Sequence, residues 1–89
     1  MKKDVVNKGD LVISESGRDK GEYLLVIKTE GDRVYLVNGK TRKVVSPKKK
    51  NVKHVKIVKK AVLIELAEKI NGTPVSDKRV RRLINSVKE

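Results

Sequence analysis

Lysine and arginine are the side chains whose number and clustering indicate a chemistry in this sequence, and that chemistry is the binding of a polyanion. The chain of 89 residues has 23 Lys and Arg against 11 Asp and Glu, for a formal net charge of +12. Residues 33–64 contain basic side chains and no carboxylate. Cations without local counterions repel one another in the compact state, and a nucleic acid relieves that repulsion. The pattern therefore favours nucleic-acid binding over a charge kept only for solubility.

Residues for catalysis or metal binding are scarce by comparison. The sequence has no Cys, and His54 is its only His. The serines lack the context of a nucleophile elbow, and no glycine pattern matches a phosphate-binding loop before a helix. We interpret His54 as a partly buried hydrogen-bonding residue, because the partners of a catalytic or metal site are missing. The chain is therefore expected to be no enzyme and to hold neither a metal nor a cofactor.

The length predicts one small domain, with room for a short appendage. At 37% hydrophobic residues the chain has enough apolar side chains for a globular core. No apolar run approaches the roughly 18 residues of a membrane span, and no signal-peptide core follows Met1. We expect a basic cytoplasmic protein that is monomeric when free and has no membrane partner.

Short apolar runs between turn residues predict strands in the first two thirds of the chain. Asn38-Gly39 is the strongest hairpin signal, since both residues tolerate positive φ, and Ser46-Pro47 stops the strand that follows. Several short strands in so few residues favour a small barrel, because closure removes exposed edges. The five predicted strands are Asp10–Ser14, Glu22–Thr29, Arg33–Val37, Arg42–Val45 and Val52–Val58.

The last third of the chain changes to helical spacing. Lys59–Ile70 predicts one helix, which Asn71-Gly72 ends, and Ser76 is the candidate N-cap of a second. An apolar stripe in the second helix is expected to pack against the first helix. The stripe is Val80, Leu83, Ile84 and Val87, and its expected partners are Leu63, Leu66 and Ile70. The predicted fold is thus mainly β, with a five-stranded barrel over residues 1–58 and a two-helix appendage over residues 59–89.

The segment Lys8–Ile27 has a strand–loop–strand pattern in which Ser16–Gly21 is the charged loop. It resembles the KOW motif, whose glycine, here Gly21, lies where the chain must turn without a Cβ. The resemblance implies that Gly21 is structural and that Arg18 and Lys20 beside it face RNA.

The resemblance continues to residue 58. Val37–Gly39, Arg42–Val45 and the Asn-x-Lys-His-x pattern of Asn51–Val55 follow in the order of an SH3-like barrel. This order is similar to the KOW-containing large-subunit ribosomal proteins of archaeal and eukaryotic type and to their small stand-alone bacterial relatives. It implies non-catalytic binding of structured RNA, above all ribosomal RNA, with ribosomal proteins as further partners.

The candidate RNA-binding residues are basic side chains of the predicted loops, the closing strand and the last helix. Guanidinium groups engage phosphate bidentately, so arginines are favoured. Two tyrosines and one histidine provide few platforms for unstacked bases, so contacts to the backbone and shape of folded RNA are expected. The candidates are Arg18, Lys20, Lys40, Arg42, Lys43, Lys48, Lys49, Lys50, Lys53, Arg79 and Arg82.

Two other functions stay open from the sequence. KOW domains also occur in transcription elongation factors, which makes a transcription-associated role the second hypothesis. Alternatively, the apolar stripe of the last helix docks a partner helix, and the protein is an interaction adaptor. Adsorption of the basic tail to anionic membranes is less favoured, since that tail has no Trp or Phe.

Overall fold

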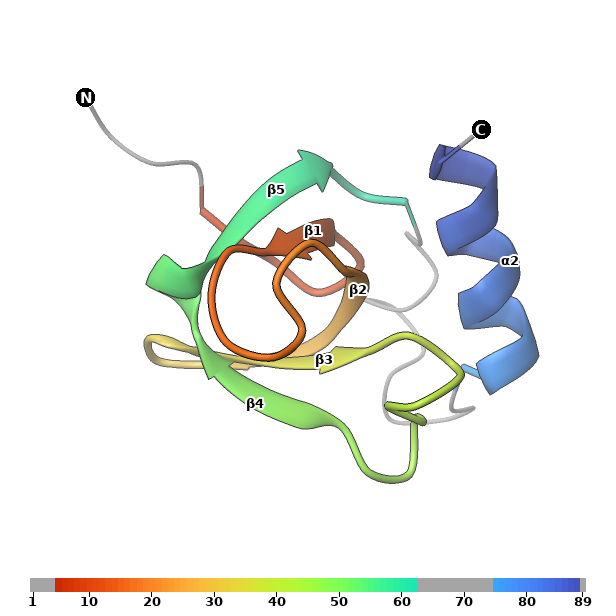
Figure 1. The fold of residues 1–89 in the computed structure, drawn as a ribbon, viewed down its shortest axis with the longest axis horizontal. Helices are drawn as coiled ribbons and strands as arrows, with labels where there is room; N and C mark the ends of the chain where they lie inside the picture. The colour runs from red at the N-terminus through yellow and green to blue at the C-terminus, as the bar shows by residue number, and fades with distance from the viewer. Residues whose placement is uncertain (1–4, 63–74, 89) are drawn as a thin grey trace.

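A computed structural model describes residues 5–62 and 75–88, which form a curled sheet with one helix beside it (Figure 1). A short 3-10 helix, η1 (Val52–His54), joins the last two strands, and the α-helix is α2 (Asp77–Lys88). Over these residues, no helix has the length and apolar character needed to cross a bilayer. The strands are β1 (Leu11–Ser14), β2 (Tyr23–Glu30), β3 (Arg33–Val37), β4 (Lys48–Asn51) and β5 (Val55–Lys59).

The strands form one antiparallel sheet in the order β4-β3-β2-β1-β5. The sheet curls, so that its edge strands β4 and β5 lie on opposite sides of the interior and are linked through η1 (Figure 1). Among the described residues β4 and β5 do not pair. The mainly β prediction is therefore confirmed as a curled five-stranded sheet, and closure of that sheet into a barrel is not found.

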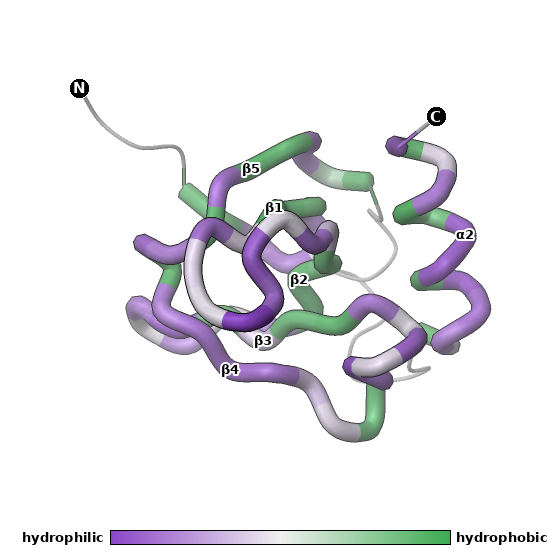
Figure 2. The backbone as a smooth tube through the Cα atoms, viewed as in Figure 1, coloured by the Kyte–Doolittle hydropathy of each residue, from purple (hydrophilic) through white to green (hydrophobic). Residues whose placement is uncertain are grey.

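Apolar side chains are buried on both faces of this sheet. One cluster fills the inside of the curl and consists of Val12, Leu24, Val26, Val34, Leu36 and Val55. The other cluster lies under α2 and consists of Leu11, Leu25, Val37, Val80 and Ile84. Successive side chains of a strand point to opposite faces, so the run Leu24–Val26 contributes to both clusters. Strand segments buried on both faces are hydrophobic without alternation. Figure 2 shows hydrophobic stretches on β1 and β2, whereas β2 ends in the hydrophilic residues Lys28–Glu30.

Helix α2 covers the outer face of the sheet. Ser76 Oγ accepts a hydrogen bond from the Arg79 N–H at 3.1 Å, which confirms Ser76 as the N-cap. Val80 and Ile84 are 0% and 6% exposed, and Leu83 and Val87 pack against the same cluster. The predicted stripe is thus real and packs on Leu11, Leu25 and Val37 of the sheet. Its expected partners Leu63, Leu66 and Ile70 lie outside the described residues.

The prediction of a fourth strand at Arg42–Val45 is wrong, because these residues belong to the connection 38–47. There Asn38 Oδ1 accepts hydrogen bonds from the N–H groups of Lys40 and Arg42, each at 2.9 Å, which holds a turn. The strand β4 is instead the lysine run Lys48–Asn51. An edge strand needs no apolar alternation, and lysines there discourage edge-to-edge pairing, so the hydrophobic pattern gave no signal for it.

Two boundaries after β4 also differ from the predictions. Asn51 Oδ1 accepts a hydrogen bond from the Lys53 N–H at 3.0 Å and caps η1, so β5 begins only at Val55. A helix that begins at Lys59 is wrong, because Lys59 ends β5 and Ala61 has φ +55°, which an α-helix does not accommodate. Residues 63–74, which hold the rest of that predicted helix, lie outside the described residues. Of the two predicted helices, the described residues contain one, α2.

Asp10 joins the segment before β1 to the segment after β5. Asp10 is buried, at 1% exposure. Its Oδ2 accepts hydrogen bonds from the Asn7 N–H at 2.8 Å and from Lys60 Nζ at 2.9 Å. Its Oδ1 accepts a hydrogen bond from the Ala61 N–H at 2.9 Å. The chain after β5 is therefore held on the sheet, and the domain boundary expected after residue 58 falls inside β5.

Two glycines with positive φ test how closely the connection 38–47 packs on α2. At Gly39, with φ +78°, a Cβ would lie 2.5 Å from the backbone oxygen of Asp77, whereas the Cβ position at Gly21, with φ +90°, is open. We expect Gly39→Ala to lower the free energy of unfolding by about 3 kcal/mol, since it adds overpacking to left-handed strain. Gly21→Ala adds the strain alone and costs about 1–2 kcal/mol. Urea unfolding measures both, and equal losses would contradict the close approach of Gly39 to α2.

Candidate nucleic-acid interface

The connection 38–47 is clamped on the first turns of α2. Arg81 Nη1 donates a hydrogen bond to the Gly39 carbonyl at 2.7 Å, and the Val44 N–H donates one to Asp77 Oδ1 at 2.8 Å. Gly39 sits directly against the Asp77 backbone, which is where a side chain would collide. Segments that are 33 residues apart in the chain are therefore held in direct contact.

This loop–helix surface is basic. It consists of the exposed residues Lys40, Arg42 and Lys43 of the connection and Lys78, Arg79 and Arg82 of α2. The acidic side chains beside it have partners within the protein: Asp77 accepts the Val44 N–H, and Glu22 Oε1 accepts a hydrogen bond from Asn38 Nδ2 at 3.3 Å. The structure thus clamps the connection on α2, but in the described part of the chain only Lys40 among the predicted residues shares a hollow with cations of the helix, Arg81 and Lys88. The predicted residues Arg79 and Arg82 line a separate hollow on α2 with Lys78, Leu83 and Ser86.

A cleft of about 390 Å³ lies beside the loop–helix surface, between the start of β2, the connection 38–47 and α2. Lys88 Nζ lies 5.4 Å from the centroid of the Tyr23 ring within this cleft, in a cation–π arrangement. The described lining is Gly21, Glu22, Tyr23, Asn38, Lys40, Thr41, Arg81, Ile84, Asn85 and Lys88. Cations, amides and one aromatic ring therefore meet at a place that also includes the predicted KOW glycine.

Lys48 and Lys50 of β4 hold the loop 15–22 in place. Lys50 Nζ donates hydrogen bonds to Asp19 Oδ1 at 2.9 Å, to Ser14 Oγ at 2.9 Å and to the Ser16 carbonyl at 2.7 Å. Lys48 Nζ lies 3.1 Å from Asp19 Oδ2. An ammonium group has three hydrogens, so Lys50 is saturated, and its side chain is only 8% exposed. The structure places this predicted RNA-binding residue inside the protein.

Asp19 is the charge at the centre of this network. Burial alone would raise the pKa of its carboxyl, but hydrogen bonds from Lys50, Ser14 and Lys48, together with the charge of Lys50, outweigh that effect. They hold the pKa of Asp19 well below its ordinary value. Counterions for the acid-free stretch 33–64 thus come from elsewhere in the chain, with Asp19 facing Lys48 and Lys50 and Asp10 facing Lys60.

The remaining predicted residues lie apart from the loop–helix surface. Arg18 and Lys20 are exposed on the loop 15–22, which meets the connection 38–47 where Glu22 contacts Asn38. Lys49 lies on β4 opposite Tyr35, with its Nζ 5.7 Å from that ring. Lys53 is exposed on η1, at the edge of a different hollow.

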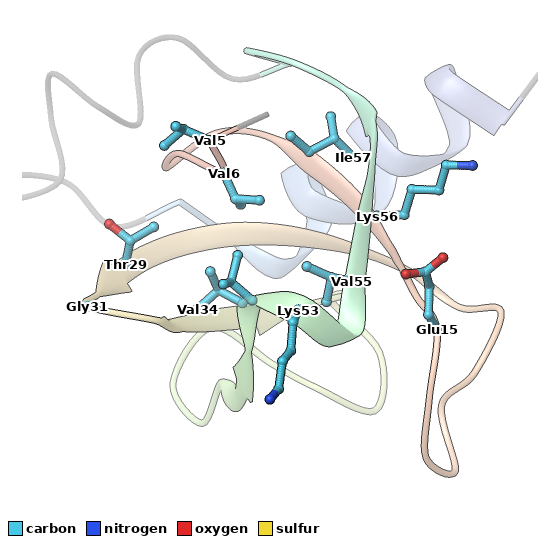
Figure 3. A pocket seen from close by; sticks show the side chains of 11 residues that line it. Val5, Val6, Glu15, Thr29, Gly31, Val34, Lys53, Val55, Lys56 and Ile57 are labelled. Atoms are coloured by element: carbon cyan, nitrogen blue, oxygen red, sulfur yellow. The ribbon is translucent and has the colours of Figure 1, made fainter. Parts of the chain in front are cut away.

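That second hollow, of about 660 Å³, opens between η1, β5 and the segment before β1 (Figure 3). Its wall is mainly aliphatic, and the side chain of Lys53 points away from it. His54 was expected to be partly buried, but it is exposed. Its backbone carbonyl accepts a hydrogen bond from the Glu15 N–H at 2.8 Å. Over residues 5–62 and 75–88, no three His, Asp or Glu side chains gather in a way that could hold a metal ion.

Sequence reasoning missed Arg81 and Lys88 as members of the candidate site. Both line the cleft with Ile84 and Asn85, and these positions are three, four and seven residues after Arg81. Residues at that spacing share one side of a helix, so the signal was present in the sequence. The sequence did not indicate that the connection 38–47 faces this side of α2.

Comparison of the sequence with protein-family models finds no match, and comparison with curated proteins finds none.

The ion network of Asp19 predicts a specific loss of stability in acid. A carboxyl whose folded pKa lies below its unfolded value contributes stability that is fully present above the unfolded pKa and is lost as the pH falls toward the folded pKa. Asp19→Asn removes this contribution and leaves Lys50 buried beside a neutral amide. We expect it to lower the free energy of unfolding at pH 7 by about 2–3 kcal/mol.

The matched control is Asp32→Asn. Asp32 is an exposed turn residue, and its carboxylate accepts one long hydrogen bond, from Asn51 Nδ2 at 3.4 Å. Urea unfolding between pH 7 and pH 2 measures both variants. Asp19→Asn is expected to lose less stability with falling pH than the unmodified protein, and the control is expected to follow that protein. An unchanged slope for Asp19→Asn would overturn the depressed pKa.

Proposed function

We propose that this protein is a non-catalytic RNA-binding protein of the ribosome, either a constituent of the large subunit or a factor bound to it. It contacts structured RNA through phosphates and shape. The observation that carries the proposal is the loop–helix surface, in which exposed cations lie both on the connection 38–47 and on the helix to which that connection is clamped.

The chemistry of this surface suits a phosphate backbone. Within the described residues, the side chains of Lys40, Arg42 and Lys43 are exposed and make no hydrogen bond or ion pair. Phosphates neutralise such cations and release condensed counterions, which drives association. The clamp of the connection on α2 orders the surface before binding, so less conformational entropy is lost on association.

The KOW relation, with its SH3-like barrel, belongs to the same proposal. The strand order, the 3-10 turn between β4 and β5, and the positive φ of Gly21 support it. Asn51, the first residue of the Asn-x-Lys-His-x pattern, caps that turn, which gives the pattern a structural reason. The relation adds ribosomal RNA as the specific partner, ribosomal proteins as neighbours and the cytoplasm as the location.

An adaptor function has lost the feature that suggested it. The stripe of α2 is used inside the protein, where Val80 and Ile84 are buried against the sheet. A partner helix would have to displace that contact. RNA binding requires no such rearrangement, because the cations of the loop–helix surface face outward.

The salt dependence of RNA binding tests the electrostatic part of the proposal. The log of the affinity for large-subunit ribosomal RNA is expected to fall linearly with the log of the salt concentration. About six phosphate contacts predict a loss of about 10³ in affinity between 50 and 200 mM salt. Filter binding across that range measures the slope, and a flat response would remove phosphate contacts as the basis of binding.

A pair of charge-matched variants locates the contacts. The first replaces Lys40, Arg42 and Lys43 with Gln, and the second replaces Lys28, Lys56 and Lys59, which lie on β2 and β5, with Gln. The first is expected to reduce the salt slope by about 3. The second is expected to change it little, and both should melt within a few degrees of the unmodified protein. Equal slopes for the two variants would contradict a localised interface.

Sedimentation of a cell lysate at low and high salt tests the ribosomal part separately. We expect the protein to migrate with the large subunit, and migration that persists at high salt indicates a constituent. Absence from ribosomal fractions at both salt concentrations would overturn the ribosomal assignment while leaving RNA binding intact.

A further inference from the structure

We infer that the cleft beside the loop–helix surface receives one unstacked nucleotide of the bound RNA, with its base against Tyr23 and its phosphate among Lys40, Arg81 and Lys88. This inference rests on the proposed function and deepens it, because it names the RNA feature that the cleft recognises. Its basis is the chemistry of the lining together with the hydrogen bonds that are already used within it.

The base side of the cleft is formed by Tyr23 and Ile84. Tyr23 is half-buried and packs against the cluster under α2, and it also lines the cleft. An aromatic ring backed by the core is a rigid platform, and unstacked bases in RNA are bound by stacking on such rings. Lys88 Nζ lies 5.4 Å from the ring centroid, so a base that stacks on Tyr23 displaces this ammonium group, which then moves to the phosphate.

The phosphate side is formed by cations from both the connection and α2. Arg81 Nη1 donates a hydrogen bond to the Gly39 carbonyl, which fixes the position of the guanidinium group. The other N–H groups of Arg81 can bind an anion. Lys40 and Lys88 line the same cleft, so with Arg81 three cations face its one carboxylate, Glu22, which accepts a hydrogen bond from Asn38. Small-ligand sites range from about 300 to 1,000 Å³, so the observed 390 Å³ suits one nucleotide.

Two asparagines in the lining have different roles. Asn38 is saturated, because its Oδ1 accepts from the Lys40 and Arg42 N–H groups and its Nδ2 donates to Glu22 and to Thr41 Oγ1. Within the described part of the chain, Asn85 is exposed and has no hydrogen-bond partner. An amide offers both a donor and an acceptor, so Asn85 is the group that contacts the edge of the base.

Two RNA hairpins that differ only in a single bulged nucleotide test the inference. The unmodified protein is expected to bind the bulged hairpin about tenfold more tightly, because stacking of one base adds that much affinity. Fluorescence anisotropy of end-labelled hairpins, with each of the four bases at the bulge in turn, measures the ratio. Tyr23→Leu and Asn85→Ala are each expected to reduce this preference while retaining binding of the fully paired hairpin.

Tyr35→Leu is the matched control, since Tyr35 lies on β3 between Lys28 and Lys49 and is also in a cation–π arrangement. It is expected to keep the preference. Tyr23 also packs on the core, so Tyr23→Leu changes the core as well as the cleft. The melting temperature of Tyr23→Leu is therefore compared with that of Asn85→Ala, because Asn85 is exposed and its replacement leaves the core intact. An Asn85→Ala variant that melts like the unmodified protein and loses the preference supports the inference.

The outcomes separate this inference from the proposed function. Equal binding of the two hairpins by the unmodified protein would overturn the nucleotide site and leave phosphate binding in place. Failure to bind either hairpin at low salt would overturn the proposed function as well. A preference that Tyr35→Leu abolishes as strongly as Tyr23→Leu would overturn the assignment to this cleft.

Discussion

The packing of α2 on the outer face of the sheet is the interaction on which the rest of the structure depends. Leu11, Leu25 and Val37 are apolar on that face and are buried in one cluster with Val80 and Ile84 of the helix. Once Val80 and Ile84 cover them, Asp77 and Arg81 are placed where the connection 38–47 passes. The clamp, the loop–helix surface and the cleft all follow from that contact.

The basic side chains fall into two groups with different physical roles. Lys50 and Lys60 are paired with Asp19 and Asp10 and hold segments of the chain together, and Lys48 joins them through Asp19. Others, such as Lys40, Arg42 and Lys43, are exposed and face outward from a clamped loop. Charge repulsion within residues 33–64 is therefore relieved partly by long-range ion pairs, and the unpaired remainder is what an RNA would neutralise.

The proposed nucleotide site modifies the expectation that binding uses the RNA backbone and shape alone. Few aromatic residues are present, but one of the two tyrosines lies in a cleft whose other walls are cationic. A single well-placed ring is enough for one unstacked base. In the proposed complex the loop–helix surface would contact phosphates, and the cleft would contact one base.

The sequence by itself determined the mainly β class, the strands β1 to β3, the N-cap at Ser76 and the apolar stripe of α2, because burial, turns and caps depend on residues that are close in the chain. Only the tertiary structure decided that β4 is the lysine run, that the stripe packs on the sheet, and that Lys50 is buried while Lys40 is exposed. These outcomes depend on partners such as Asp19 and Asp77, which lie 31 residues from Lys50 and 33 from Val44. The residues next to a lysine in the chain do not show whether it will be paired and buried, as Lys50 is, or exposed, as Lys40 is. The carboxylate that makes the difference comes close only when the chain folds.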